Sequence, residues 1–229
     1  MNQVNAYHKL DSLITKGRKS EFFSELRDKV IVTCQQLGIT DQSKILDNLS
    51  RLWLPLALNL AQARNTLDRT LIQGILGGQG TGKTTLCIIL KLILNDLGFS
   101  VATLSIDDLY LTYEERQALQ AKDSQLIWRG PPGTHNIEDG IKVINQCLRQ
   151  DDLVEIALPR FDKSQHSGAG DRIEPEVVPK PDILLFEGWF VGVRPIAKSF
   201  FDNPPAPIIT AEDKQFAVDC NRRLQAYLP

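Results

Sequence analysis

The feature that most constrains this chain is the glycine-rich segment Gly77-Gly-Gln-Gly-Thr-Gly-Lys-Thr84, which follows a short apolar run. It matches GxxxxGK[ST], a loop whose backbone amides and following helix N-terminus bind phosphate groups. Lys83 is spaced to reach the β- and γ-phosphates of a nucleotide, and the Thr84 hydroxyl is spaced to bind Mg²⁺. We therefore predict a nucleoside triphosphate site formed by Gly77, Gly78, Gln79, Gly80, Thr81, Gly82, Lys83, Thr84 and Thr85.

The pattern on either side of this loop is that of an α/β fold. The apolar run 71–77 predicts a buried strand, the segment 83–97 a helix that ends at Gly98, and the run 101–106 a second strand. Strand, helix and strand in this order are typical of a parallel sheet flanked by helices. We expect a fold of the P-loop NTPase type, with this domain occupying residues 71–229.

Residues 1–70 contain no catalytic signature and predict a helical extension. Apolar residues repeat at helical spacing from Phe22 to Cys34, and Asp41 or Ser43 is suited to cap the next helix. Pro55 is expected to kink or divide that helix. The apolar stripe predicts packing against the main domain, because amphipathic helices usually bury one face.

Composition excludes several classes of partner and site. A formal net charge of −2 argues against general binding to nucleic acid or to membrane surfaces, and charged residues interrupt the longest apolar run. The four cysteines form no CxxC pair, which favours free thiols over a zinc site or disulfides. Because the first 30 residues fit neither a signal nor a transit sequence, we expect a cytoplasmic protein; the oligomeric state stays open.

Two acidic positions suit phosphoryl-transfer chemistry. Glu187 ends the apolar run Ile183-Leu-Leu-Phe, where an acid can orient Mg²⁺ beside the phosphate-binding loop. Asp107 follows the strand 101–106 and is the candidate base near an acceptor hydroxyl, with Asp108 a neighbour of undefined role. The alternative for Asp107 and Asp108 is that they cap the next turn. The chain has no NKxD motif, which argues against a guanine-specific switch protein.

Several further elements are predicted from capping signals and apolar runs. Thr112 with Glu115, and Asn136 with Asp139, have the spacing of helix starts, the second helix ending near Gln150. The run 153–158 predicts a strand, and the segment 213–228 a helix. The glycines and prolines between residues 159 and 182 predict a long loop, and loops of that length in compact domains are usually functional or mobile.

SxDxxY at Ser105–Tyr110 and FEG at Phe186–Gly188 resemble the P-loop kinases that include uridine kinase, phosphoribulokinase and pantothenate kinase. Four further stretches resemble D-glycerate 3-kinase of the plant and cyanobacterial type: Arg129-Gly-Pro-Pro-Gly-Thr-His-Asn136, Leu158-Pro-Arg-Phe-Asp-Lys-Ser164, Gly170-Asp-Arg172 and Glu187-Gly-Trp-Phe190. The similarity covers about residues 71–229. The family carries Asp where Asn136 stands here.

This resemblance implies ATP- and Mg²⁺-dependent phosphorylation of D-glycerate to 3-phosphoglycerate. Lys83 and Asp107 would be catalytic, Thr84 and Glu187 would hold the metal, and the acceptor would contact Asp107, Tyr110, Arg129, His135, Arg160, Lys163 and Arg172. Basic residues fit a small carboxylate substrate. His135 could equally be structural, and each arginine could be a solvated surface charge.

The resemblance also implies a C-terminal strand, a lid and adenine-contacting elements beyond residue 229, so the chain is expected to be C-terminally truncated. Two alternatives stay open. The acceptor could be a different small molecule, as in uridine kinase or pantothenate kinase, or the chain could be a catalytically impaired nucleotide-binding module.

Overall fold

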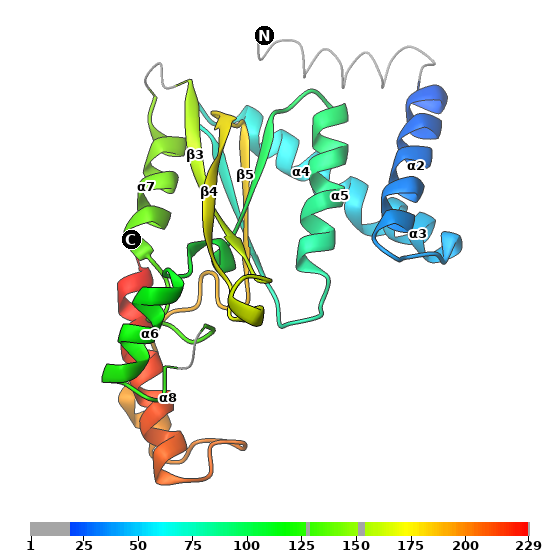
Figure 1. Ribbon diagram of the computed structural model, residues 1–229. Helices are drawn as coiled ribbons and strands as arrows, with labels where there is room; N and C mark the ends of the chain where they lie inside the picture. The colour runs from blue at the N-terminus through cyan, green and yellow to red at the C-terminus, as the bar shows by residue number, and fades with distance from the viewer. Residues whose placement is uncertain (1–18, 127–128, 151–153, 229) are drawn as a thin grey trace.

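A three-stranded parallel sheet forms the centre of the computed structural model, which describes residues 19–126, 129–150 and 154–228 (Figure 1). Its strands are β1 (Leu71–Leu76), β2 (Val101–Ser105) and β5 (Ile183–Gly188), in the spatial order β1-β5-β2. β5 pairs in parallel with both neighbours, and its apolar residues are almost wholly buried. The carboxyl ends of the three strands therefore meet at one edge, where ligands of such sheets bind.

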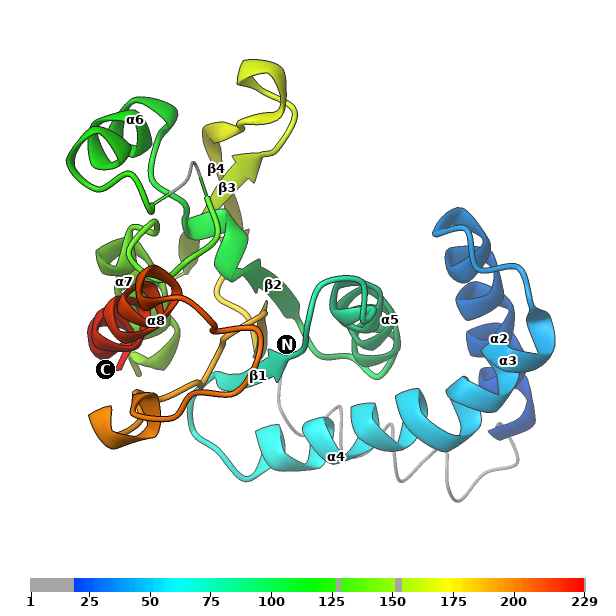
Figure 2. The ribbon, with the colours of Figure 1, turned by 90° about the horizontal axis from the view of Figure 1, so that it is seen from below.

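Helix α5 (Lys83–Asp96) connects β1 to β2 and covers one face of the sheet (Figure 2). This arrangement confirms the predicted strand–helix–strand unit. β1 and β2 do not pair with each other, because β5 lies between them. Gly98, which follows α5, has a φ of +96°, a conformation that glycine adopts without a steric penalty.

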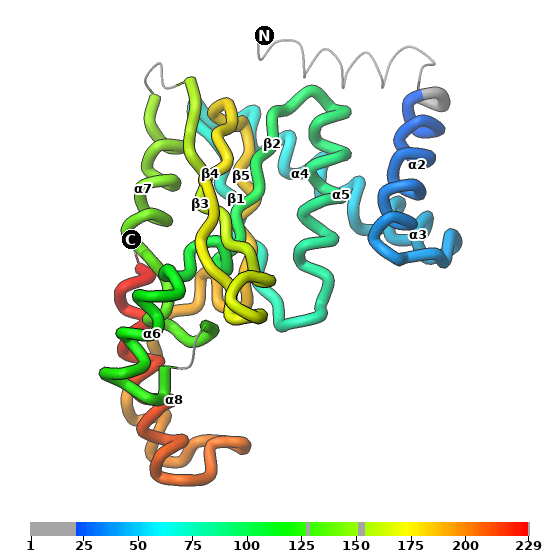
Figure 3. Tube along the Cα trace, in the orientation of Figure 1, coloured from blue at the N-terminus to red at the C-terminus, as the bar shows by residue number. Residues whose placement is uncertain are grey.

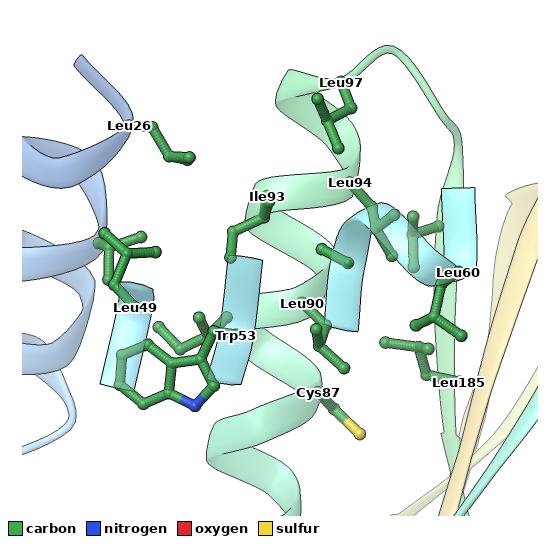
Figure 4. Close-up of a cluster of buried hydrophobic side chains, with 14 of the residues drawn as sticks. Leu26, Leu49, Trp53, Leu60, Cys87, Leu90, Ile93, Leu94, Leu97 and Leu185 are labelled. Carbon is green, nitrogen blue, oxygen red and sulfur yellow. The ribbon is translucent and has the colours of Figure 1, made fainter. Parts of the chain in front are cut away.

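The N-terminal helices pack on the outer side of α5, as the apolar stripe predicts. They are α2 (Lys19–Gln36), α3 (Gln42–Asn48), the π-helical turn η1 (Leu49–Trp53) and α4 (Leu54–Asn65). Figure 4 shows Leu26, Leu49 and Trp53 facing Leu90 and Ile93 of α5 in one buried cluster. This packing explains why these helices form despite their weak individual patterning.

One local prediction in these helices is confirmed. The Asp41 carboxylate accepts a hydrogen bond from the Lys44 amide at 3.1 Å and caps α3. Pro55 does not divide the next helical segment, because residues 42–65 are helical without a break. The irregularity beside the proline is the π-helical turn η1, which directly precedes the first turn of α4.

The predicted loop between residues 159 and 182 is wrong. β3 (Glu155–Asp162) and β4 (Asp171–Pro179) form an antiparallel hairpin, joined by a turn that contains η3 (His166–Gly168). Prolines fit this hairpin because a two-stranded ribbon has positions whose N–H groups face outward. Pro159 lies where the register shifts between Leu158 and Arg160, and β4 is mostly exposed. β3 also runs beyond the predicted end at Leu158, and residue 153 lies outside the described residues.

The capping signals correctly predicted the starts of two further helices. Thr112 and Glu115 form a capping box at α6 (Tyr113–Lys122), and Asn136 caps α7 (Ile137–Leu148), which ends slightly before the predicted Gln150. The predicted C-terminal helix comprises α8 (Ala211–Arg223) and η5 (Leu224–Tyr227). Two further short helices are η2 (Ile106–Leu109) and η4 (Lys198–Phe201).

All four thiols are free, and Cys34, Cys87 and Cys147 are buried. Burial raises the pKa of the Cys87 thiol to about 12, so it is not an activated nucleophile. Among the described helices, none combines the length and the apolar character that crossing a bilayer requires.

Candidate active site

The glycine-rich loop joins β1 to α5 at the carboxyl edge of the sheet (Figure 3). Gly80 and Gly82 have φ values of +71° and +85°, which explains glycine at both positions. The Lys83 ammonium donates to the Gly78 carbonyl at 2.8 Å and so lies folded over the loop. Backbone amides, a helix N-terminus and a lysine thus converge on one point, as phosphate binding requires.

The predicted metal-binding pair is brought together by strand order. β5 lies beside β1, so Glu187 at its end reaches the first turn of α5, and its carboxylate accepts a hydrogen bond from the Thr84 hydroxyl at 3.0 Å. Among the described residues, no cluster of three or more His, Cys, Asp or Glu side chains could hold a metal ion alone. One hydroxyl and one carboxylate nevertheless fit Mg²⁺, which takes few protein ligands when phosphates supply the others.

Asp107 and Asp108 are neighbours on η2 with different surroundings. The Asp107 carboxylate faces the site and forms an ion pair with the Lys163 ammonium at 2.6 Å. The Asp108 carboxylate turns back to accept from the Ser105 amide at 2.9 Å and from Arg160 at 3.0 Å. Burial raises the pKa of Asp108 even though Arg160 opposes this effect. Asp108 thus caps η2, whereas Asp107 is available to a ligand.

A cavity of about 570 Å³ brings most of the predicted residues together. It is lined by Gly78, Gln79, Gly80, Lys83, Thr84, Ser105, Asp107, Tyr110, Arg129, Gly130, Lys163, Glu187, Gly188 and Trp189. A second cavity of about 400 Å³ shares Thr84, Asp107, Lys163 and Glu187 and adds Arg160. The nucleotide loop, the metal pair and the candidate base therefore surround one continuous space.

His135 lies behind this cavity and lines neither space. Its ring stacks on that of Tyr110 at 4.4 Å, and its Nδ1 lies 2.8 Å from the Tyr227 hydroxyl of η5. Burial lowers the pKa of His135 to about 4, although Asp107 acts in the opposite direction. The arrangement suits a neutral imidazole that supports Tyr110, which does line the cavity.

The arginines occupy three different environments. Arg129 lines the main cavity and donates to the Ala169 carbonyl at 3.2 Å. Arg160 lies on β3, pairs with Asp108 and Glu176, and lines the second cavity. Arg172 lies on β4, pairs with Asp139, and lines neither cavity. The expectation that Arg160 and Arg172 stand in loops is wrong, because the hairpin places both on strands.

Four residues of the main cavity were not assigned from the sequence. They are Ser105, Gly130, Gly188 and Trp189, which lie within the motifs but whose residue types carried no specific chemical expectation. Trp189 is 40% exposed and packs edge-on against Phe190, so its ring forms a wall of the cavity. The signal that could have found them is proximity to the strand ends, where side chains face the crevice.

Known proteins resemble this chain in sequence and structure. No family model matches it. The chloroplastic D-glycerate 3-kinase of Arabidopsis thaliana is 33% identical over 165 residues, covering 69% of this chain and 34% of the plant protein. A Saccharomyces cerevisiae protein named as a "probable ATP-dependent kinase" is 35% identical over 162 residues, covering 66% of this chain and 53% of that protein.

The structural similarity agrees with the sequence similarity. The structure of D-glycerate 3-kinase from Cryptococcus neoformans superimposes with a TM-score of 0.64 at 26% identity, covering 77% of this chain and 68% of that one. The chain spans 34% and 53% of the lengths of the two curated relatives. It belongs to the group of P-loop kinases that includes D-glycerate 3-kinase.

Proposed function

We propose that this protein transfers the γ-phosphoryl group of ATP to the 3-hydroxyl of D-glycerate. The observation that carries the proposal is the single cavity into which Lys83, Asp107, Arg129 and Lys163 project beside the glycine-rich loop. Three cations around one carboxylate base suit a small anionic acceptor next to a triphosphate. The similarity to two D-glycerate 3-kinases supports the choice of acceptor.

The residues divide the reaction between them. The loop amides and Lys83 bind the phosphates and stabilise charge on the transferring group. Asp107 accepts the proton of the acceptor hydroxyl as its oxygen bonds to the γ-phosphorus, while the bond to the bridging oxygen breaks and ADP leaves. Arg129 and Lys163 hold the glycerate carboxylate. Thr84 and Glu187 would hold Mg²⁺, which neutralises charge on the phosphates.

The assignments of Tyr110, His135, Arg160 and Arg172 to the acceptor stay predictions. Tyr110 is suited to contact it directly, and His135 to act through Tyr110. Arg160 and Arg172 are each paired with carboxylates, so a direct role requires one of those ion pairs to open. The cytoplasmic location, the domain boundary at residue 70 and the absence of nucleic-acid and membrane partners likewise stay predictions from the sequence.

A comparison of acceptors tests this function. ADP release would be measured with glycerate, uridine, pantothenate and ribulose 5-phosphate at equal concentrations, with MgATP saturating. We expect ADP release that depends on glycerate, together with 3-phosphoglycerate identified by ³¹P NMR. Turnover of a different acceptor would identify that acceptor, and not glycerate, as the substrate. Nucleotide binding without any acceptor-dependent ADP release would indicate a binding module.

A further inference from the structure

The buried guanidinium of Arg116 is not part of the site described above. Arg116 lies on α6, is 2% exposed, and lines neither cavity. Burying a cation is unfavourable unless hydrogen bonds replace its hydration, so such a residue requires a structural or functional explanation. No motif in the sequence singled it out.

The guanidinium joins two segments that are distant in sequence. It donates to the Leu111 carbonyl, directly after Tyr110, and to the carbonyls of Ala169 at 2.9 Å and Gly170 at 2.6 Å in the β3–β4 turn. It also lies 5.0 Å from the centre of the Phe161 ring of β3. Only arginine offers enough donors in a planar fork to reach these carbonyls together.

The turn that Arg116 holds also positions two cations of the cavity. Lys163, near its start, pairs with Asp107, and Arg129 donates to the same Ala169 carbonyl that Arg116 uses. The turn is strained, because His166 and Ser167 have φ values of 49° and 57°. A strained turn needs fixed external contacts to keep one conformation, and Arg116 supplies two of them.

We propose that Arg116 is a positioning residue for acceptor binding. By holding the carbonyls of Ala169 and Gly170 it fixes the β3–β4 turn where Lys163 and Arg129 face the cavity, and through Leu111 it fixes the segment after Tyr110. It touches neither nucleotide nor acceptor. The kinetic part of this inference rests on the proposed glycerate kinase function, whereas the structural part does not.

Two variants of Arg116 and one matched control test the proposal. Arg116→Met keeps the apolar stem beside Phe161 and removes every donor, and Arg116→Lys keeps the charge without the fork. Lys122→Gln removes an exposed cation from the same helix. We expect the KM for glycerate to rise about tenfold or more in Arg116→Met and less in Arg116→Lys, with the KM for ATP unchanged, because misplaced binding groups weaken one substrate selectively. Lys122→Gln should match the wild type.

Hydrogen exchange gives a readout that needs no activity. Backbone amides of residues 163–170 should exchange at least about tenfold faster in Arg116→Met than in wild type, while those of α5 keep their protection. Unchanged exchange in the turn, or a parallel rise of both KM values, would overturn the proposal. If Arg116→Met does not fold, the KM values and the hydrogen exchange of Arg116→Lys test the proposal in its place. If glycerate does not raise ADP release by the wild type, the proposed function is refuted. The hydrogen-exchange result would still test the structural role of Arg116.

Discussion

At the residue scale, adjacent acids on η2 illustrate how surroundings assign roles to identical groups. Asp108 is held by the Ser105 amide and Arg160, so its carboxylate is committed to structure. Asp107 interacts with the Tyr110 hydroxyl and forms an ion pair with the 57% exposed Lys163, and exposed ion pairs of this kind contribute little stability. A bound acceptor can therefore displace Lys163 from Asp107 at small cost.

Replacing the candidate base tests this division. Asp107→Asn should leave MgATP affinity unchanged and lower glycerate-dependent turnover by about 10²–10⁴-fold, because the change removes basicity and charge but little volume. Calorimetry and coupled ADP release measure the two quantities, with the exposed Asp68→Asn as the control. Lost nucleotide affinity would instead assign Asp107 to the metal site.

The buried imidazole of His135 predicts a dependence of stability on pH. Its pKa is about 4 in the fold, against an ordinary value near 6.5, so the unfolded chain binds more protons between these values. Its stabilising contribution is complete above pH 6.5 and is lost as the pH falls toward 4. Urea unfolding should show wild type losing about 2 kcal/mol more than His135→Phe between pH 7 and pH 5. Equal losses in the two proteins would mean that His135 titrates normally.

The glycine-rich loop, Glu187 and Asp107 could be predicted from sequence because their chemistry depends on local spacing. The partners of Arg172 and Arg116 could not. Arg172 meets Asp139 and Arg116 meets Ala169 only after a hairpin, unforeseen in the sequence analysis, folds against α6 and α7. Long-range pairing of this kind leaves no periodic signal in a single sequence.

At the scale of elements, helices were predicted better than the hairpin. Capping pairs such as Thr112 with Glu115 fix a helix start within four residues, so the signal is contained in the local sequence. The β3–β4 hairpin has prolines at positions 159, 175 and 179 and an exposed second strand. Those features are also typical of loops, and only pairing between the two strands distinguishes the structures.

The N-terminal helices should contribute substantially to stability through their packing on α5. Trp53 is 7% exposed within the buried cluster, whereas its neighbour Leu52 is 50% exposed. Trp53→Ala should lower the free energy of unfolding by about 3–5 kcal/mol, because it leaves a large cavity. Leu52→Ala is the matched control and should change it by less than about 0.5 kcal/mol. Similar effects of both changes in urea unfolding would show that the helices pack only loosely.

At the scale of the whole molecule, nucleotide binding should stabilise the fold by mass action. At one hundred times its dissociation constant, MgATP should add about 2.7 kcal/mol, an increase in Tm of about 5–10 °C. Lys83→Met should remove most of this increase, EDTA should reduce it, and Lys122→Gln should keep it. Differential scanning fluorimetry measures all four conditions. An undiminished shift in Lys83→Met would place the nucleotide elsewhere.

The central position of β5 has a consequence for the order of assembly. β1 and β2 both pair with β5 and with no other described strand, so neither acquires its ladder hydrogen bonds until residues 183–188 are available. During synthesis, β1, which precedes the glycine-rich loop, therefore stays unpaired until more than one hundred later residues have left the ribosome. Pairing over such separations slows folding and prolongs the exposure of strand edges that can associate with other chains. Glu187 also lies on β5, so pairing of this strand completes the sheet and brings Glu187 beside Thr84 in one event.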